Sequence, residues 1–361
     1  MKQIKVLHCG LSDNKGGIEN VVHSWFENKP EDVIFDFIND SDNPIAYEDE
    51  FIKGGSKIYH IENRYKHPFK RFNSFKKIIQ NGDYDYFHFH VMNNDEMGPI
   101  IACNISKKTK AIVHCHSMNL LKNTFKENIL LFESSLLGIG QKYLRLSCSK
   151  VAGKHMFGDK EFTVINNGVD FKKFSFNEDF RKEIRSKYNI KDEDIIIGHV
   201  GHDCIEKNYP FLMSVIKNVV EKNNNVKLLL VGNLDKSDNV KELIKNNNLE
   251  NNVIFTGLVS DVYKYYSAMD MFLLPSISEG FPVTLVEAQA SGLPCVVSDI
   301  ITQETKISDI IYFLKLEEDI FVDKIVNIIN EHNDRNNIVL DDNYEIRNTT
   351  KSLINFYREN L

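Results

Sequence analysis

The chain has 361 residues, of which 42% are hydrophobic, and this length favours two domains with ordinary apolar cores. Its formal net charge is -7 and its pI is about 6.0, which argues against a nucleic-acid-binding protein. The six cysteines form no CxxC pair, so neither a zinc site nor a disulfide framework is predicted. We find no signal peptide and no bilayer-spanning run, and we expect a cytoplasmic protein.

Short apolar runs alternate with longer amphipathic segments along the chain. Runs this short and unbroken are typical of strands that are buried on both faces of a parallel sheet. The segments between them, such as Phe211–Val220 and Val240–Asn246, have helical spacing, and the alternation predicts an α/β architecture. The predicted strands include Ile4–Leu7, Tyr86–Phe89, Ala111–Val113, Thr163–Ile165, Ile195–Val200, Val226–Val231, Val253–Phe255, Met271–Leu274 and Cys295–Val297.

A polar, charge-mixed stretch, Phe171–Asp194, interrupts this alternation. We place the domain boundary at its start, which gives a first domain over residues 1–170 and a second over 171–342, each with a doubly wound, Rossmann-like parallel sheet. The segment 343–361 predicts an amphipathic closing helix that could cross back onto the first domain. Ligands of such sheets bind at the carboxyl ends of the strands, so we expect strand ends on both walls of an interdomain cleft.

The stretch Glu279–Glu287 carries the strongest chemical signal of the chain. It follows the predicted strand Met271–Leu274 and opens a helix. Gly280 permits a tight turn and a close approach to a ligand, and Pro282 suits the first turn of a helix, where its missing N–H costs little. The start of this helix is therefore a candidate site for an anion such as phosphate.

Two carboxylates flank that helix start. The free N–H groups of Val283 and Thr284 would point toward the anion, and Glu279 and Glu287 could both face the same ligand. Carboxylates beside a phosphate are useful if they accept hydrogen bonds from sugar hydroxyls. From these residues alone, an amphipathic helix with surface acids is an equally good interpretation.

The wider pattern Glu-Gly-Phe-Pro…Glu-Ala…Gly-Leu-Pro resembles the signature of retaining glycosyltransferases of family 4, and it is similar to bacterial capsule and exopolysaccharide transferases. The resemblance implies the GT-B fold, with two Rossmann-like domains and an interdomain cleft. It implies that Glu279 holds the donor sugar and that Glu287 holds the ribose. Around them, the expected donor-binding residues are Gly280, Phe281, Pro282, Val283 and Thr284.

Two further loops resemble the same family. Gly16 and Gly17 follow the first strand and precede an apolar helix, and in the family this loop brings backbone amides to the donor diphosphate. Taken alone, a Gly-Gly pair is most often a simple turn. Leu258 and Val259 lie in a loop that resembles the one whose backbone contacts the nucleotide base.

Histidines occur in two HxH pairs, His88 with His90 and His114 with His116. Alternate residues of a strand face the same way, so the pairs could bind zinc, although no cysteine pair or acidic cluster nearby completes a ligand set. The family resemblance favours another role. His116, followed by Ser117, resembles the cleft histidine that is essential for transfer, and the other three would line the cleft or the end of the sheet.

The segment after the strand Ile195–Val200 differs from the family pattern at one position. Glu206 and Lys207 match the family's Glu-Lys, and Lys207 would bind the diphosphate, but His202 replaces the usual arginine. A histidine lacks the fixed charge and the bidentate fork of arginine. His202 could bind phosphate more weakly or only when protonated, or another cation could substitute.

The resemblance predicts transfer of a hexose or N-acetylhexosamine from a nucleoside-diphosphate sugar, taken as a UDP-sugar. The acceptor would be a hydroxyl of a glycan or lipid-linked oligosaccharide in bacterial surface polysaccharide synthesis. The anomeric configuration would be retained without metal or other cofactor, and the catalytic residues would be His116, Lys207 and Glu279. A UDP-sugar 2-epimerase-like GT-B enzyme and a non-catalytic nucleotide-sugar-binding partner are the alternatives, and His202 alone favours the latter.

The segment Arg64–Gln80 is rich in lysine and arginine and carries Phe69, Phe72 and Phe75 at helical spacing. Such a helix could lie on the inner face of the cell membrane, where a lipid-linked acceptor would be found. An ordinary helix that packs its phenylalanines on the sheet explains the same pattern.

Overall fold

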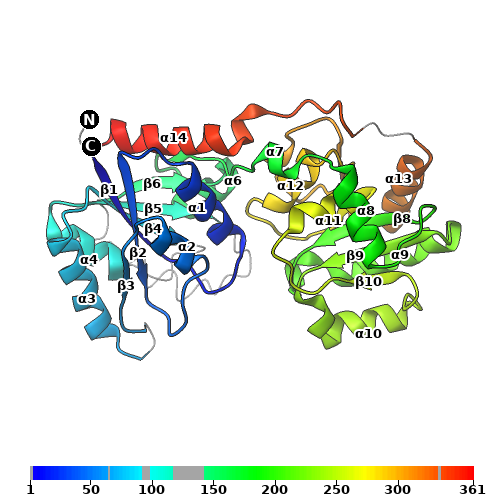
Figure 1. The fold of residues 1–361 in the computed structure, drawn as a ribbon, viewed down its shortest axis with the longest axis horizontal. Helices are drawn as coiled ribbons and strands as arrows, with labels where there is room; N and C mark the ends of the chain where they lie inside the picture. The colour runs from blue at the N-terminus through cyan, green and yellow to red at the C-terminus, as the bar shows by residue number, and fades with distance from the viewer. Residues whose placement is uncertain (1–2, 64–65, 92–97, 117–141, 332–334) are drawn as a thin grey trace. The chain divides into compact units, whose positions relative to one another are not determined.

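The computed structural model describes residues 3–63, 66–91, 98–116, 142–331 and 335–361, which divide into two compact units (Figure 1). Unit 1 comprises Met1–Gly168 together with Ile346–Leu361, and unit 2 comprises Val169–Glu345. Unit 1 thus ends two residues before the predicted boundary. The polar stretch at the start of unit 2 is not a linker, because it forms the helices α7 (Phe171–Phe174) and α8 (Glu178–Lys187).

The described part of unit 1 contains a seven-stranded parallel sheet in the order β3-β2-β1-β4-β5-β6-β7. Its strands are β1 (Ile4–Cys9), β2 (Val33–Asn39), β3 (Ile58–His60), β4 (Tyr86–Val91), β5 (Lys110–Cys115), β6 (Leu144–Ser147) and β7 (Thr163–Val164). Its helices are α1 (Gly17–Asn28), α2 (Glu48–Lys53), α3 (Pro68–Asn81), α4 (Gly98–Ser106), α6 (Lys150–Phe157) and α14 (Ile346–Glu359).

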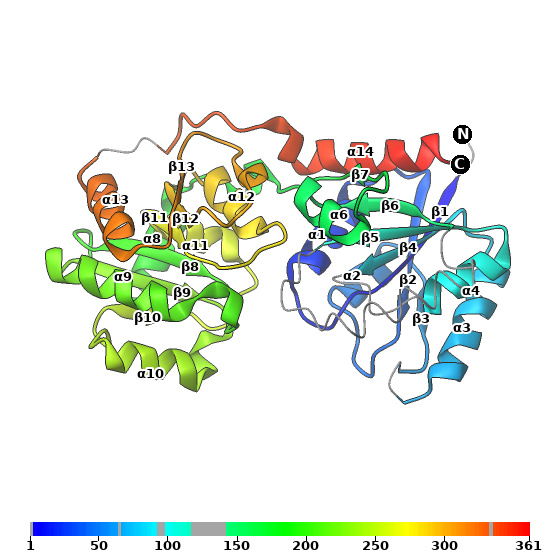
Figure 2. The same cartoon turned by 180° about the vertical axis from the view of Figure 1, so that it is seen from behind.

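Strand β4 distributes its side chains to the two faces of this sheet in alternation. Phe87 contacts Phe75 of α3 on one face, with the ring centroids 6.0 Å apart. Tyr86 and His88 contact Tyr357 of α14 on the other face, where α1 also packs against α14 (Figure 2). The face toward α1 and α14 is therefore the one that carries the even-numbered side chains of β4.

Helix α14 is an integral part of unit 1, although it follows unit 2 in the sequence. The Tyr86 hydroxyl donates a hydrogen bond of 2.6 Å to the backbone carbonyl of Tyr357. Arg358 pairs with Asp32 at 2.9 Å, and Leu353 is fully buried. The helix thus closes one face of the unit 1 sheet.

Unit 2 contains a six-stranded parallel sheet in the order β10-β9-β8-β11-β12-β13 among its described residues. Its strands are β8 (Ile195–Val200), β9 (Val226–Val231), β10 (Val253–Phe255), β11 (Met271–Leu274), β12 (Cys295–Ser298) and β13 (Ile311–Leu314). Besides α7 and α8, its helices are α9 (Tyr209–Lys222), α10 (Asp238–Asn246), α11 (Val262–Ala268), α12 (Val283–Ala290) and α13 (Glu318–Asn330).

Helices cover both faces of the unit 2 sheet. Leu273 of β11 faces an apolar core that includes Leu212 of α9 and Phe321 of α13. The neighbouring Phe272 contacts Tyr266 of α11 on the opposite face. Two doubly wound parallel sheets with helices on both faces confirm the predicted Rossmann-like fold class of the chain.

The strand order reverses once in each sheet, between β1 and β4 in unit 1 and between β8 and β11 in unit 2. In open α/β sheets, ligands bind outside the carboxyl ends of the strands at such a reversal. The loops after β8 and β11 therefore mark the first place to look for a site in unit 2, and the end of β1 does so in unit 1.

Helix α3 contains most of the basic segment 64–80, of which residues 64–65 lie outside the described residues. Arg71 and Phe75 of α3 are buried, and Arg71 pairs with Asp40, whereas the Phe69 side chain is 87% exposed. In the described parts of the chain, no helix combines the length and the apolar character that crossing a membrane requires. None of the six cysteines is joined in a disulfide.

Candidate active site

Two loops meet at the strand reversal of unit 2. The loop after β8 contains the short 3-10 turn η1 (Ile205–Lys207), and the loop after β11 leads into α12. The backbone N–H of Ile277 donates to the carbonyl of Glu206 at 2.8 Å, and the Asn208 amide donates to the carbonyl of Pro275 at 3.2 Å. These bonds fix the two loops against each other and bring Lys207 beside the second loop.

Lys207 and Glu279 form an ion pair at this point. The Lys207 Nζ lies 2.8 Å from Glu279 Oε1, and the two side chains are only 11% and 15% exposed. The Ser276 hydroxyl donates to the same carboxylate oxygen at 2.8 Å. The pair is thus partly desolvated, so the lysine charge is balanced by the carboxylate and can be drawn toward an incoming anion.

The start of α12 carries free backbone donors next to this ion pair. Pro282 occupies the N-cap position, and no side chain within the described parts of the chain caps the helix. The buried Thr284 Oγ1 also has no hydrogen-bond partner among the described residues. Phe281 stacks on Tyr344 with the ring centroids 5.7 Å apart, which anchors the turn. Uncapped N–H groups at a helix start form a natural anion site.

Glu287 lies one turn inside α12 and is more deeply buried than Glu279. The Tyr266 hydroxyl donates a hydrogen bond of 2.7 Å to Glu287 Oε2. Burial raises the pKa of Glu287 to about 7, against the lowering effects of the Tyr266 hydrogen bond and of Lys173. The two glutamates of the motif therefore differ in setting, because Glu279 is paired with a cation and Glu287 with a tyrosine hydroxyl.

The other predicted donor-binding residues of unit 2 also lie at carboxyl ends of its strands. His202 follows β8 and has an exposed side chain, and its carbonyl accepts a hydrogen bond of 3.2 Å from the Tyr209 hydroxyl. Leu258 and Val259 follow β10, and the Leu258 side chain is 78% exposed. Because β10 lies at the edge of the sheet beyond β9, this loop is separated from β8 by a full strand.

In unit 1, the predicted glycine pair opens helix α1. Gly16 is the N-cap residue, and the carboxylate of Glu19 folds back to accept bonds from the Ser12 N–H at 2.8 Å and the Ser12 hydroxyl at 2.9 Å. A Cβ at Gly16 would lie 2.8 Å from Glu19 Oε2, whereas one at Gly17 would meet open space. Gly16 therefore makes room for the carboxylate that shapes the loop, and Gly17 leaves the helix start accessible.

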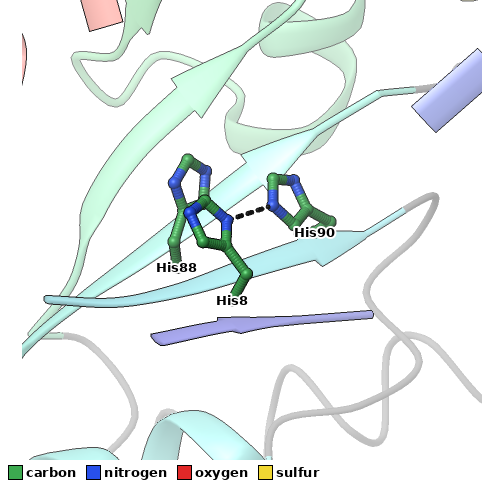
Figure 3. A group of neighbouring side chains, drawn as sticks. All are labelled: His8, His88 and His90. Carbon is green, nitrogen blue, oxygen red and sulfur yellow. Dashed lines mark hydrogen bonds between the residues drawn. The ribbon is translucent and has the colours of Figure 1, made fainter. Parts of the chain in front are cut away.

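His116 belongs to a cluster of five buried imidazoles, which we call the histidine cluster. It lies on the face of the unit 1 sheet that α1 and α14 cover, and Trp25 of α1 stacks on one of its rings, His114, at 5.6 Å. Figure 3 shows three of its members from β1 and β4, with the bond between His8 and His90. The members are His8, His88, His90, His114 and His116.

The structure distinguishes between the two places predicted for the other histidines. His88, His90 and His114 are buried between the sheet and its covering helices, and His90 and His114 lie near the carboxyl ends of β4 and β5, at the end of the sheet. His116, just past the end of β5, keeps 7% exposure, and its Nδ1 atom is buried without a partner among the described residues. Ser117, the other half of that predicted motif, lies outside the described residues.

Three residues that shape these sites were missed in the sequence. Ser276 had a local signal, because it precedes Glu279 by three residues in the same loop. His8 also had one, as a polar residue directly after the predicted strand Ile4–Leu7, and it lies within β1. Tyr266 had none, because its contact with Glu287 depends on how α11 packs against α12.

Comparison with known proteins identifies the class of this molecule. The "Putative glycosyltransferase EpsF" of Bacillus subtilis is 28% identical over 313 residues, covering 84% of this chain and 81% of that protein. The "UDP-Gal:alpha-D-GlcNAc-diphosphoundecaprenol alpha-1,3-galactosyltransferase" of Escherichia coli is 25% identical, covering 93% and 92% of the two chains. The crystal structure of Anabaena Alr3699/HepE with UDP and glucose superposes with a TM-score of 0.75 at 16% identity, covering 99% and 100% of the two chains.

The two Rossmann-like sheets and these relatives define a glycosyltransferase with the GT-B fold. Residues 180–338 match the family described as Glycosyl transferases group 1. The matched region covers the whole candidate site of unit 2, including the Lys207–Glu279 pair and helix α12. The chain is accordingly an enzyme of the glycosyltransferase class, and the region that matches the group 1 family lies within unit 2.

Proposed function

We propose that the chain is a retaining glycosyltransferase that moves a sugar from a UDP-sugar to a hydroxyl of a glycan or lipid-linked acceptor in bacterial surface polysaccharide synthesis. The observation that carries the proposal is the Lys207–Glu279 pair beside the uncapped start of α12. The UDP bound in the Anabaena structure supports the choice of nucleotide. The diphosphoundecaprenol acceptor in the name of the E. coli relative supports a lipid-linked acceptor. We place this reaction at the cytoplasmic face of the membrane.

The arrangement in unit 2 suits a diphosphate with a sugar attached. The donor phosphates would accept hydrogen bonds from the first N–H groups of α12 and attract the Lys207 ammonium away from its carboxylate partner. Glu279 would then be free to accept hydrogen bonds from hydroxyls of the transferred sugar. Glu287 would hold the ribose hydroxyls, and the exposed loop at Leu258 would contact the base through its backbone.

In unit 1, we assign the start of α1 at Gly16 and Gly17 to the donor diphosphate and His116 to the positioning of the reacting centre. The Gly16 N–H already donates to the Asn14 carbonyl at 2.8 Å, so the Gly17 N–H is the donor that we assign to the phosphate. In the transfer step the bond between the anomeric carbon and the phosphate oxygen breaks, and the acceptor oxygen bonds to that carbon on the same face. The leaving phosphate takes the acceptor proton. Lys207 and the α12 amides stabilise the charge that develops on the phosphate, so no covalent enzyme intermediate or metal is required.

The proposal is tested first with the purified full chain. UDP- and GDP-sugars are screened for thermal stabilisation, and donors that bind are tested for transfer to glycan and polyprenyl-diphosphate acceptors. NMR of the product should show the donor's anomeric configuration, and EDTA should leave the rate unchanged. An inverted product, or a chelator loss restored by Mn²⁺ or Mg²⁺, would contradict the mechanism. Epimerisation of the free donor would identify an epimerase, and binding without turnover a non-catalytic partner.

Replacement of the ion pair tests the site itself. We expect Lys207→Ala and Glu279→Ala each to lower turnover by roughly 10²–10³-fold, because each removes a charged side chain that would contact the donor. Lys264→Ala is the matched control, because Lys264 also pairs with a glutamate, Glu183, at 2.8 Å but does so on the surface of the same unit. Near-normal turnover in both site variants would overturn the assignment.

A further inference from the structure

Three members of the histidine cluster are joined end to end. His8 Nδ1 lies 2.9 Å from His90 Nε2, and His90 Nδ1 lies 2.9 Å from His116 Nε2. The three rings come from β1, from β4 and from the residue after β5, so the chain of rings runs across neighbouring strands. The other two imidazoles form a separate series, in which the Tyr357 hydroxyl bonds His88 and His88 bonds His114.

The ring geometry is that of hydrogen bonding between imidazoles. The centroids of His8 and His90 are 5.3 Å apart with the ring planes only 6° from parallel, and those of His90 and His116 are 5.1 Å apart. Separations of this size, with bonded nitrogens 2.9 Å apart, require each nitrogen to point at its partner along the line that joins the rings.

This geometry disfavours a metal, although two sets of three histidines come close enough to suggest one: His8, His88 and His90, and His90, His114 and His116. A zinc ion lies about 2.0–2.1 Å from each histidine nitrogen, so it does not fit between two nitrogens that oppose each other at hydrogen-bond distance. A metal site would need the lone pairs to converge on one point. The nitrogens that lie closest to one another are instead used in bonds between the rings.

Two arrangements of protons satisfy the three-ring series, because a neutral imidazole has one N–H and one bare nitrogen. In the first, His8 donates to His90, His90 donates to His116, and the outermost N–H is on His116 Nδ1. In the second, every proton is shifted by one place, and the outermost N–H is on His8 Nε2. Neither of these two end nitrogens has a partner among the residues that the structure describes.

The surroundings of the two ends favour the first arrangement. His8 has no exposed surface, and its ring lies against Phe35 and Phe37, which offer no acceptor oxygen or nitrogen. A buried N–H without an acceptor is among the rarest features of folded proteins, whereas a bare acceptor is better tolerated. His116 directly follows β5 and its ring retains 7% exposure, whereas His8 has none. Both end nitrogens are buried atoms, but only that of His116 belongs to a ring that reaches the surface.

We propose that His8 and His90 are positioning residues that hold His116 as its Nδ1–H tautomer, so that His116 donates a hydrogen bond to an oxygen of the nucleotide-sugar. The role toward that ligand rests on the proposed function, whereas the tautomer itself does not. A free histidine favours the opposite, Nε2–H tautomer. The series of rings thus determines that the proton of His116 is on Nδ1, the nitrogen that does not bond His90. Neither HxH pair could determine this alone.

The test reads the tautomer directly. The full chain is labelled with ¹⁵N-histidine, and long-range ¹H–¹⁵N correlation identifies which nitrogen of His116 carries the proton. We expect Nδ1–H in the wild type and in His90→Asn, because the asparagine amide retains an N–H in the place of His90 Nδ1. We expect His90→Phe, which removes that donor, to shift His116 to the Nε2–H tautomer.

His88→Phe is the matched control, because it alters an equally buried ring of the same cluster but leaves the three-ring series intact. His116 should keep its Nδ1–H tautomer in this variant. Finding Nε2–H in the wild type would overturn the proposal without any variant, even if His90→Phe failed to fold. Loss of the N–H signals between the rings on addition of Zn²⁺ would also overturn it, in favour of a metal site.

Measuring the activity of the same variants tests the proposed function separately from the tautomer. We expect His90→Phe to lower kcat/KM for the UDP-sugar about tenfold, the scale of one hydrogen bond to a charged group, and His90→Asn to restore most of it. A shift of tautomer with unchanged kcat/KM would support the role of the three-ring series in setting the tautomer, but it would show that His116 has no part in the proposed mechanism. An unchanged tautomer with reduced kcat/KM would show that the three-ring series does not set the tautomer, and it would remain consistent with the proposed function.

Discussion

The two units share one topology but place different chemistry at the same position of the sheet. In unit 1, the reversal between β1 and β4 carries the histidine cluster, whose members lie within strands or directly after one. In unit 2, the reversal between β8 and β11 carries an ion pair, Lys207 with Glu279, on loops that follow the strands. Unit 1 thus offers neutral donors and acceptors there, and unit 2 offers charges.

The difference follows from where the polar side chains are attached. A side chain within a doubly covered strand is cut off from water, and its charged form is strongly disfavoured. Burial lowers the pKa of His8 and of His116 to about 3, and it holds the pKa values of His88, His90 and His114 well below their usual range. Loops after the strands keep contact with water, so Lys207 and Glu279 can be charged there.

The largest expected consequence is that unit 1 is the more acid-sensitive unit. Each buried histidine has a folded-state pKa below the unfolded value of 6.5, so below pH 6.5 the unfolded chain binds more protons. The free energy of unfolding therefore falls as the pH drops from 6.5 toward 3, by up to about 1.4 kcal/mol per pH unit for each histidine. Unit 1 buries five such groups, and the described part of unit 2 buries one, His199.

Two probes separate the units in an acid titration. Trp25 is the single tryptophan of the chain and contacts the histidine cluster, so its fluorescence reports on unit 1, while far-UV circular dichroism reports on both units. We expect the fluorescence change at a higher pH than the final loss of ellipticity. His67→Asn, at an exposed position of unit 1, should leave the fluorescence midpoint in place. Coincident midpoints for both probes would show that the units unfold together.

A second prediction concerns the buried carboxyl of unit 2. Because the folded-state pKa of Glu287 is raised to about 7 from 4.5, the folded chain binds more protons between these values, and stability falls as the pH rises through them. Glu287→Gln removes that loss, so its stability relative to the wild type should increase by roughly 2–3 kcal/mol from pH 4.5 to above pH 7. Chemical denaturation at several pH values measures it. A difference that does not vary with pH would show that Tyr266 keeps the carboxylate ionised at no cost.

The smallest effect is expected at His202. His202→Arg would add a fixed charge and a bidentate donor to the loop after β8, making unit 2 still more charged relative to unit 1. We expect the Kd for UDP to fall by roughly two- to tenfold, the gain from one charge-assisted hydrogen bond. Isothermal titration calorimetry measures this change, with His202→Gln as a neutral control. An unchanged Kd for His202→Arg would indicate that this position does not reach the diphosphate.

The sequence was sufficient for strands in which apolar residues dominate the run, even with one polar residue near an end. Ile195–Val200 and Val226–Val231 are β8 and β9 with the same bounds. It was insufficient for β2, where Asp36 interrupts the run. That carboxylate is buried because the Tyr84 hydroxyl donates to it at 2.6 Å, a contact between residues far apart in the sequence. In β2 the charged residue stands in the middle of the run, and nothing local in the sequence indicates that it can be buried.

The same distinction holds for the candidate site. The glycine, proline and glutamates around α12 are local in sequence, so their pattern predicted a helix start fit for an anion. The bond between Lys207 and Glu279 joins residues 72 positions apart, and that between His8 and His90 joins residues 82 apart. Which carboxylate pairs with which cation, and which rings meet, are set by the order of strands in each sheet and could not be predicted from spacing.

Unit 1 is built from two stretches of chain that are separated by the whole of unit 2. Helix α14, whose Tyr357 bonds His88, leaves the ribosome only after unit 2 has been synthesised. Until then, α1 alone covers that face of the first sheet, and the contacts of Tyr357 with Tyr86 and His88 are missing. The unit whose synthesis begins first can therefore complete its folding only after the whole of unit 2 has been synthesised.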